Sequence, residues 1–203
     1  MRCIAIPAPE IREDARFEFV DRGQLIAEPG AFVSTALHSP VTGTVRDIGP
    51  HRYTDGNFRP AIEIEADPYA TQQLPRPAPI DWESLNVEQF IEHVQRAGIV
   101  GMGGAAFPSH VKYAIPEGQQ IDELLINGAE CEPYLTTDHR LMVERPEAVI
   151  HGTEIVRRKL GAKHATIGVE KNKPDAIEIL RKHVGDLPID VLGLEVKYPQ
   201  GAE

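Results

Sequence analysis

The distribution of apolar and polar positions changes its period along the chain. From residue 121 onward, short apolar runs alternate with stretches in which apolar residues recur every three or four positions. These patterns predict strands at 121–126, 165–170 and 189–196, and helices at 138–143, 146–160 and 174–184. Strands that alternate with helices form parallel sheets, so we expect a layered α/β architecture in this half.

The first 67 residues show a different pattern, in which short alternating segments are separated by turn residues. The segments predict strands at 4–6, 17–20, 24–27, 32–36, 43–48 and 61–65. The turn residues Pro40, Gly43 and Gly49 break up this region, and no stretch is long enough for a helix. We therefore expect a small all-β domain with half-buried strands.

A proline-rich stretch separates the two patterns. The segment 68–79, PYATQQLPRPAP, contains four prolines and has no periodic apolar face, which favours a semi-extended linker. After it, Asn86 and Gln89 have the spacing of a helix-capping box, and Gly98 is placed to end that helix. The predicted fold is thus a Rossmann-like parallel-sheet α/β domain at residues 82–203. A small all-β domain at 1–67 and a linker at 68–81 precede it.

Composition excludes several classes of function. The 203 residues carry a formal net charge of -10, which argues against a nucleic-acid or anionic-membrane partner. Cys3 and Cys131 are too few for a disulfide framework, and the scattered histidines lack the spacing of a zinc site, so we predict no metal ligands. Apolar runs are far shorter than the roughly 20 residues of a membrane span, which predicts no direct membrane insertion. A reducing cytoplasm suits this composition best.

A glycine-rich loop is the first candidate binding element. Gly101, Gly103 and Gly104 crowd a loop that Pro108 leads into a short helix carrying Lys112. Several backbone N–H groups and one ammonium can therefore converge on a phosphate. The segment 101–106 formally satisfies the dinucleotide pattern G-x-G-x-x-G/A, but it follows a predicted helix instead of a strand. A tight helix–helix connection without a ligand is the alternative interpretation.

A second candidate follows the apolar run 124–126. Asn127-Gly128 ends that run, and Glu130, Cys131, Glu132, Tyr134 and Asp138 come after it. A strand that ends in polar groups delivers them to the crevice at the carboxyl edge of a parallel sheet, where 198–203 would also fall. Alternatively, Asn127-Gly128 is a hairpin turn, the acidic residues form a solvated loop, Asp138 caps a helix and Cys131 only packs.

These two segments also carry a family resemblance. GMGGAAFPSHVK at 101–112 and INGAECEPYLTTDHRLM at 126–142 resemble the signature segments of the C subunit of Rnf-type electron transport complexes. They are more distantly similar to the flavoprotein subunit of respiratory complex I, which has an acidic residue where this chain has Ala129. The resemblance implies a flavin mononucleotide (FMN) site that exchanges hydride with a nicotinamide.

The resemblance further implies roles for individual residues. Phe107 would stack on the nicotinamide nucleotide, and Glu132 would also contact this substrate. No side chain would act as a catalytic acid or base, because the cofactor carries the chemistry. The implied cofactor-binding residues are Gly101, Gly103, Gly104, Ala105, Lys112, Asn127, Glu130, Glu132, Gly201 and Glu203.

The N-terminal region resembles a second known module. GQLIAEPGAFVSTALHSPVTGTVRDI at 23–48 is similar to the barrel sandwich of lipoyl and biotinyl carriers, and the Rnf C subunit begins with such a domain. A carrier presents a lysine for acylation, whereas no lysine precedes Lys112 here. We therefore expect this domain to be structural or to serve as a docking surface.

The leading functional hypothesis is part of an ion-translocating ferredoxin:NAD oxidoreductase. Electrons would pass between NAD(H), FMN and two four-iron four-sulfur clusters, which we expect only in a C-terminal part missing after Glu203. Other subunits of the complex would hold the protein peripherally on the inner face of the cell membrane. The alternatives are a cobalamin reductase-like flavoprotein of a metabolic microcompartment and a non-catalytic docking module.

Overall fold

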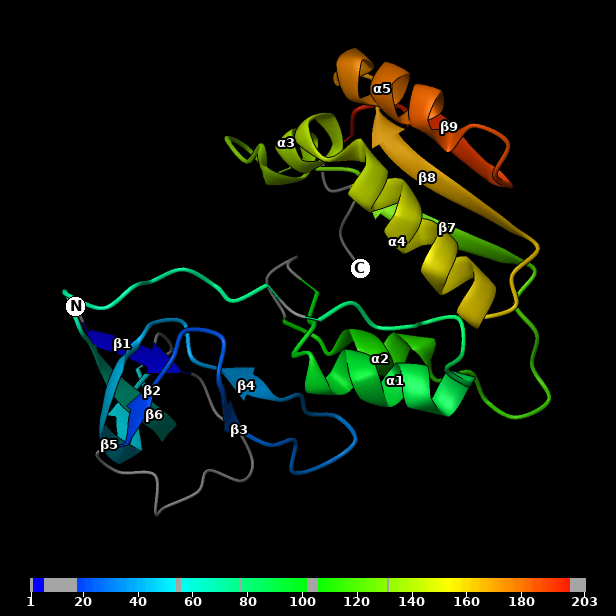
Figure 1. Cartoon of the computed structure of the whole chain (residues 1–203). Coiled ribbons are helices and arrows are strands. Elements are labelled where there is room, and N and C mark those ends of the chain that lie inside the picture. Colours follow the sequence, from blue (N-terminus) through cyan, green and yellow to red (C-terminus); the bar gives the residue numbers. More distant parts are fainter. Residues whose placement is uncertain are drawn as a thin grey trace. The chain divides into compact units, whose positions relative to one another are not determined.

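The computed structural model describes residues 2–5, 18–53, 56–76, 78–101, 106–130 and 132–197, with only the backbone described for 2–5. The chain divides into two compact units, Met1–Ala114 and Ile115–Glu203. Figure 1 labels the helices and strands of both units and colours the chain from blue at the N-terminus to red at the C-terminus. We call them the N-terminal and the C-terminal unit and describe each by itself.

The N-terminal unit begins with antiparallel β structure. Four strands form one sheet in the order β1-β6-β5-β2, and β3 pairs with β4 in a second, two-stranded sheet. Val45, Ile62 and Ile64 are fully buried between these layers, since alternate side chains of β5 and β6 point into the core. The strands are β1 (Arg2–Ala5), β2 (Phe19–Val20), β3 (Leu25–Ala27), β4 (Leu37–His38), β5 (Gly43–Arg52) and β6 (Phe58–Ala66).

The prediction of a strand at 32–36 is wrong, because this stretch belongs to the loop between β3 and β4. Its backbone groups bond to side chains and to a helix instead of to a neighbouring strand. The Ala36 N–H, for example, donates to the Gln95 carbonyl oxygen at 3.2 Å, and the Ser34 carbonyl oxygen accepts from Gln95 Nε2 at 2.9 Å. The other predicted β segments overlap β1, β2, β3, β5 and β6.

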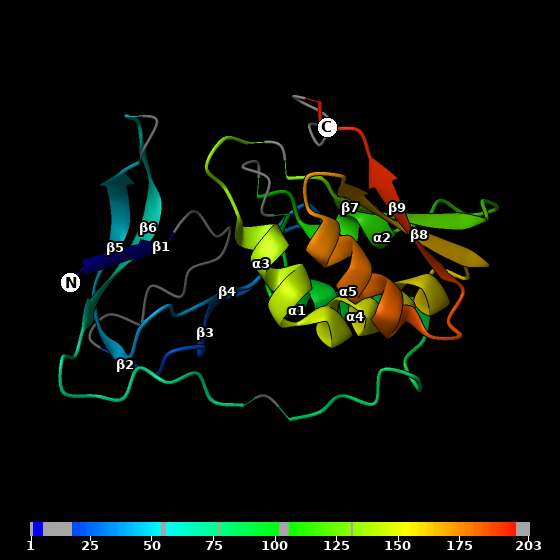
Figure 2. The ribbon, with the colours of Figure 1, turned by 90° about the horizontal axis from the view of Figure 1, so that it is seen from above.

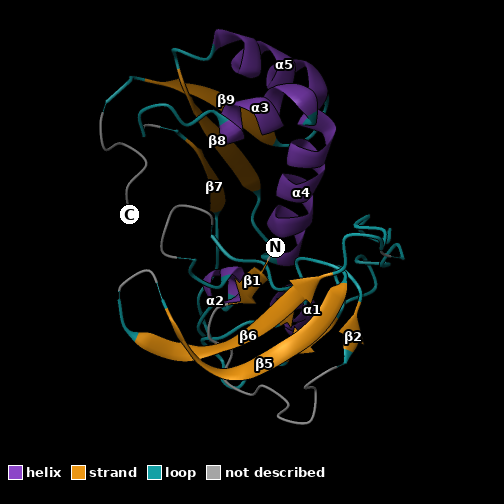
Figure 3. Ribbon diagram, turned by 90° about the vertical axis from the view of Figure 1, so that its left-hand side faces the viewer, coloured by secondary structure: helices purple, strands orange, loops and turns teal. Residues whose placement is uncertain are grey.

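The paired strands β5 and β6 form a long curved arm, which Figure 3 shows in profile. The register places Pro50 opposite Pro60. Tyr53 donates its N–H to the carbonyl oxygen of Asn57 at 2.8 Å near the end of the arm. Because directly opposed residues alternate between hydrogen-bonded and non-hydrogen-bonded pairs, Pro50 and Pro60 occupy a non-hydrogen-bonded pair.

The central part of the predicted linker is hydrogen-bonded to the β structure. Thr42 and Gln72 exchange two hydrogen bonds, from the Thr42 N–H to Gln72 Oε1 at 2.9 Å and from Gln72 Nε2 to the Thr42 carbonyl at 3.0 Å. Arg22 adds a contact from Nη1 to the Gln72 carbonyl at 2.5 Å. The chain around Gln72 therefore lies along the β layer.

The described part of the N-terminal unit also contains two helices, α1 (Val87–Arg96) and α2 (Ser109–Tyr113). The predicted capping box is confirmed, because the Asn86 side chain accepts from the Gln89 N–H and the Gln89 side chain accepts from the Asn86 N–H. The rings of Phe90 and Tyr113 stack with centroids 5.8 Å apart, which joins the two helices. In Figure 2 the elements of this unit are seen from above.

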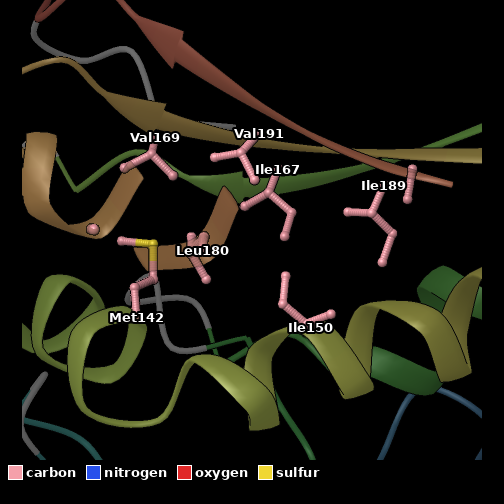
Figure 4. Packing of buried hydrophobic residues seen from close by; sticks show 9 residues of the cluster. Met142, Ile150, Ile167, Val169, Leu180, Ile189 and Val191 are labelled. Carbon is pink, nitrogen blue, oxygen red and sulfur yellow. The ribbon is translucent and has the colours of Figure 1, made fainter. Parts of the chain in front are cut away.

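The C-terminal unit is the predicted α/β layer. Its parallel strands have the order β7-β8-β9, and helices connect them. Figure 4 shows Ile150 and Leu180 from two of these helices packed against Ile167, Val169 and the strand beside them. The elements are β7 (Glu123–Gly128), α3 (Thr137–Glu144), α4 (Pro146–Lys159), β8 (His164–Glu170), α5 (Pro174–Val184) and β9 (Ile189–Leu194). This confirms the predicted fold class.

Candidate functional site

The base of the glycine loop is closed by backbone contacts in the N-terminal unit. Val100 and Pro108 form an isolated antiparallel bridge. Beside it, the Gly101 N–H donates to the Phe107 carbonyl at 2.8 Å, and the Ser109 N–H donates to the Ile99 carbonyl at 3.0 Å. The chain therefore leaves and returns at one point, as in a hairpin. Gly103, Gly104 and Ala105 lie outside the described residues.

Lys112 brings a positive charge to this closed base. A Cβ atom built on Gly101 would lie 3.9 Å from Lys112 Nζ and 3.7 Å from the Phe107 carbonyl oxygen. A larger side chain at position 101 would therefore occupy the space beside the ammonium. Lys112 is exposed on the short helix α2, so an anion from solvent can approach its charge.

Ala106 and Phe107 form the returning side of the loop. Ala106 has a φ of +49°, in the left-handed region that a residue with a Cβ rarely adopts. Backbone strain of this kind persists where the surroundings fix the chain, and it is frequent at ligand clamps. The Phe107 side chain is 41% exposed, so its ring can still stack on a ligand.

The second candidate element lies at the carboxyl edge of the parallel sheet in the C-terminal unit. Asn127 is near the end of β7 and is paired in register with Gly168 of β8. Its Oδ1 accepts a hydrogen bond from the Ala129 N–H at 3.0 Å, which starts the turn after the strand. The interpretation of Asn127-Gly128 as a hairpin turn is wrong, because β7 and β8 run parallel and α3 and α4 lie between them in the sequence.

Glu130 is a buried cap of helix α3. Its Oε1 accepts from the Asp138 N–H at 2.8 Å and its Oε2 accepts from the His139 N–H at 3.3 Å. A carboxylate at this position satisfies two of the N–H groups that a helix start leaves unpaired. Glu132 is exposed instead, so solvent or a ligand can reach its carboxylate. Contacts of Glu130 and Glu132 with a cofactor stay predictions.

Two charged residues that the sequence reasoning did not single out lie behind Glu130. Lys173 Nζ donates to Glu170 Oε2 at 2.5 Å, to the Glu130 carbonyl at 3.2 Å and to Asn172 Oδ1 at 3.3 Å. Glu170 is fully buried, and its Oε1 has no hydrogen-bond partner among the residues that the structure describes. The three-residue spacing of Glu170 and Lys173 is visible in the sequence. Their burial is not, because it arises from their position at the end of the buried strand β8.

Charges around α3 shift two carboxyl groups in opposite directions. Burial raises the pKa of Asp138, and the neighbouring Glu130 and Glu132 raise it further, while Lys173 opposes them. The pKa of Asp175 is lowered, first by its hydrogen bond with His139 and then by the Ala176 N–H. The carboxyl edge of the sheet thus holds one carboxyl group with a raised pKa and one with a lowered pKa.

The structure assembles part of the predicted site within each unit. The N-terminal unit brings Gly101, Phe107 and Lys112 together, and the C-terminal unit brings Asn127 to the edge that carries Glu130 and Glu132. Cys131, Gly201 and Glu203 lie outside the described residues. Among the described side chains, no group of three or more His, Cys, Asp or Glu could hold a metal ion, and no described helix is long and apolar enough to cross a membrane.

Two protein-family models match the chain. The model of the Nuo51 FMN-binding domain matches residues 94–203, which is more than half of the chain. The chain belongs to the Nuo51 FMN-binding family. The model of the RnfC barrel sandwich hybrid domain matches residues 15–69, so the N-terminal resemblance is confirmed as well. Both signature segments, 101–112 and 126–142, lie inside the Nuo51 match.

Curated relatives of this Nuo51-family chain are C subunits of ion-translocating complexes. The C subunit of the proton-translocating ferredoxin:NAD(+) oxidoreductase complex of Clostridium ljungdahlii is 43% identical over 91% of this chain and 40% of its own length. The Na(+)-translocating counterpart of Acetobacterium woodii is 43% identical over 89% of this chain and 41% of its own length. The chain therefore spans about two fifths of these relatives.

A solved structure shows the same type of fold. The crystal structure of an NAD+-reducing [NiFe]-hydrogenase in the air-oxidized state aligns with a TM-score of 0.50 and 23% identity. The alignment covers 58% of this chain and 22% of the hydrogenase chain. At this identity the likeness supports the α/β fold alone.

Proposed function

We propose that the protein binds FMN, with the phosphate held by the glycine loop and Lys112. The closed base of the loop, with Lys112 Nζ beside Gly101, is the observation that carries this proposal. Backbone N–H groups at a tight glycine loop and a nearby ammonium suit a phosphate, and the family model names the same cofactor.

The acidic edge of the C-terminal unit supplies hydrogen-bond acceptors for a polyol or ribose. We assign this task to the exposed Glu132 and to Asn127, whereas Glu130 acts first through the helix that it caps. Phe107 offers a ring for the nicotinamide nucleotide. Bound FMN supplies the hydride chemistry, so these side chains bind and orient and no described side chain has to move a proton.

In this proposal the protein is an NAD(H)-dependent flavin subunit of an Rnf-type complex. Its relatives are C subunits of ferredoxin:NAD(+) oxidoreductases, which supports electron transfer between NAD(H) and iron–sulfur clusters. The partners would be the other subunits of that complex, which would keep the protein at the inner face of the membrane. These relatives do not favour the cobalamin reductase alternative.

Flavin titration tests the proposal directly. FMN and riboflavin are added separately to the 203-residue chain, and quenching of flavin fluorescence gives each dissociation constant. We expect FMN to bind more tightly than riboflavin, because only FMN carries the phosphate. Lys112→Ala should weaken FMN binding by about 1–3 kcal/mol, the range for a lost charge-assisted hydrogen bond. Riboflavin binding should stay unchanged in this variant.

Lys163→Ala is the matched control, since Lys163 is exposed and pairs with Asp122, which precedes β7 at the end of the strand opposite to Asn127. Equal affinity for FMN and riboflavin in the unaltered protein would contradict a phosphate site. Equal weakening of both flavins by Lys112→Ala would place Lys112 against another part of the flavin.

A further inference from the structure

The loop between β3 and β4 holds the end of helix α1. We call residues 28–36 the brace loop. Gln95 Nε2 lies 3.2 Å from the Ala31 carbonyl and 2.9 Å from the Ser34 carbonyl. The Gln95 carbonyl in turn accepts from the Ala36 N–H and from Thr35 Oγ1, each at 3.2 Å. One residue of α1 thus engages the brace loop with both its side chain and its backbone.

The same loop holds helix α2 through His110. His110 Nε2 lies 2.6 Å from the Phe32 carbonyl oxygen, and because a carbonyl only accepts, this nitrogen carries the proton. The Phe32 ring packs edge-on against the imidazole, with centroids 5.4 Å apart. His110 is fully buried, which is rare for a histidine and makes the Phe32 contact structurally important.

These two contacts lie on either side of the glycine loop. Gln95 precedes Gly101 by six positions, and His110 precedes Lys112 by two. Gly98, between Gln95 and Gly101, passes so close to the brace loop that a Cβ there would lie 2.8 Å from the Ala36 carbonyl oxygen. The brace loop therefore fixes both the chain that enters the glycine loop and the helix that carries the ammonium.

We propose that Gln95 and His110 are positioning residues for the phosphate cradle, which consists of the glycine loop and Lys112. Both residues would hold the cradle in place by bonding to the brace loop of the β domain. The inference rests on the proposed FMN site. A cradle whose two flanks are already fixed loses less conformational freedom when the anion binds. The β domain then has a task in cofactor binding, although it lacks a carrier lysine.

The phosphate contribution to flavin binding is the readout that separates positioning from general stability. It is measured as the ratio of the riboflavin and FMN dissociation constants in the whole chain. His110→Phe keeps a ring but removes the donor to Phe32, and Gln95→Ala removes the contacts to the Ala31 and Ser34 carbonyls. We expect each variant to lower the ratio by about fivefold or more, as one lost hydrogen bond would, while riboflavin binding is unchanged. His110→Gln places an amide N–H where Nε2 lies and should restore the ratio.

Matched controls come from exposed positions of helix α1, which also carries Gln95. His93→Phe repeats the histidine substitution, and Glu88→Ala repeats the truncation, at side chains that are exposed. Both should leave the ratio unchanged. An unchanged ratio in His110→Phe and Gln95→Ala, or equal weakening of both flavins, would overturn the inference while Lys112→Ala still reports the phosphate site. No preference for FMN in the unaltered protein, with no effect of Lys112→Ala, would overturn the proposed site and this inference together.

Discussion

Lys173 Nζ lies 2.5 Å from Glu170 Oε2, and both side chains are almost completely buried at the end of β8. The ammonium also holds the carbonyl of Glu130, so this pair anchors the turn after β7. Lys173→Met should destabilise the C-terminal unit by about 3–5 kcal/mol, because it leaves the Glu170 carboxylate buried without its counter-charge. Urea unfolding followed by circular dichroism measures the loss.

The double variant Lys173→Met and Glu170→Met separates lost pairing from lost packing. It should recover most of the stability, since no charge is then left buried. Lys163→Met, at an exposed pair with Asp122, should change stability by roughly 0–1 kcal/mol and serves as the surface control. A single and a double variant of equal stability would show that the Glu170 charge is not the cause.

We expect Glu130 to have a structural role and Glu132 to have a ligand-binding role. Glu130→Ala removes both acceptors at the start of α3 and should cost about 1–2 kcal/mol of stability, as other lost helix caps do. Glu132→Ala at an exposed position should change stability by less than about 0.5 kcal/mol. It should instead raise the dissociation constant for FMN or NADH. Thermal unfolding and ligand titration of both variants check the division, which fails if Glu132→Ala alone destabilises the fold.

Gly98→Ala should loosen the junction between α1 and the brace loop. Gly98 has a φ of +71°, and an added Cβ would meet the Ala36 carbonyl oxygen at 2.8 Å. Gly118 has a φ of +81° with open space around it, so Gly118→Ala imposes the backbone strain without the clash. We expect Gly98→Ala to cost about 1–3 kcal/mol more than Gly118→Ala, the range for overpacking. Denaturant midpoints of the two variants give this difference.

Glu154 and Arg157 should contribute a stability that disappears in acid. Arg157 donates from Nε and Nη2 to the two oxygens of Glu154, each at 2.7 Å, and these bonds are the largest cause of the lowered pKa of Glu154. A lowered pKa in the folded state means that the contribution is complete above the ordinary pKa of 4.5 and is lost as the pH falls through the folded value.

Glu154→Gln should therefore be destabilising at neutral pH and less destabilising in acid. We expect a cost of about 1–2 kcal/mol at neutral pH, after solvent screening reduces the value typical of a charged hydrogen bond. Urea midpoints of the variant and the unaltered protein at about pH 7 and about pH 3 give the comparison. A difference that stays constant between the two pH values would contradict the pKa argument.

Local signals are sufficient to predict most elements of the fold. The capping box of Asn86 and Gln89 and the prolines at 146 and 174 lie at the helix starts where the sequence places them. These features act within one turn, so their neighbours in sequence are their neighbours in space. The pattern at 32–36 wrongly predicts a strand, because the partner of this stretch, Gln95, is some sixty positions away and leaves no local signal.

The candidate site can also be predicted only where its residues are close together in the sequence. Gly101 and Lys112 are visible in the sequence because the loop and the short helix are consecutive in the chain. The buried pair of Glu170 and Lys173 escapes sequence reasoning, since charged residues three apart usually lie on an exposed helix face and only the sheet edge buries this pair. His110 escapes it for a related reason, because its partner Phe32 belongs to the preceding β domain.

The opposed prolines of the β5–β6 arm have a consequence for solubility. At a non-hydrogen-bonded pair the backbone N–H of each residue points away from the partner strand, toward the outer edge of the ribbon. Among the described strands, β2 covers β5 only at Gly43 and Thr44, and β1 covers β6 only at 62–65. Pro50 and Pro60 remove one outward donor from each remaining edge, so a second molecule finds no continuous ladder there on which to add a strand. The arm can thus project from the domain without promoting edge-to-edge aggregation.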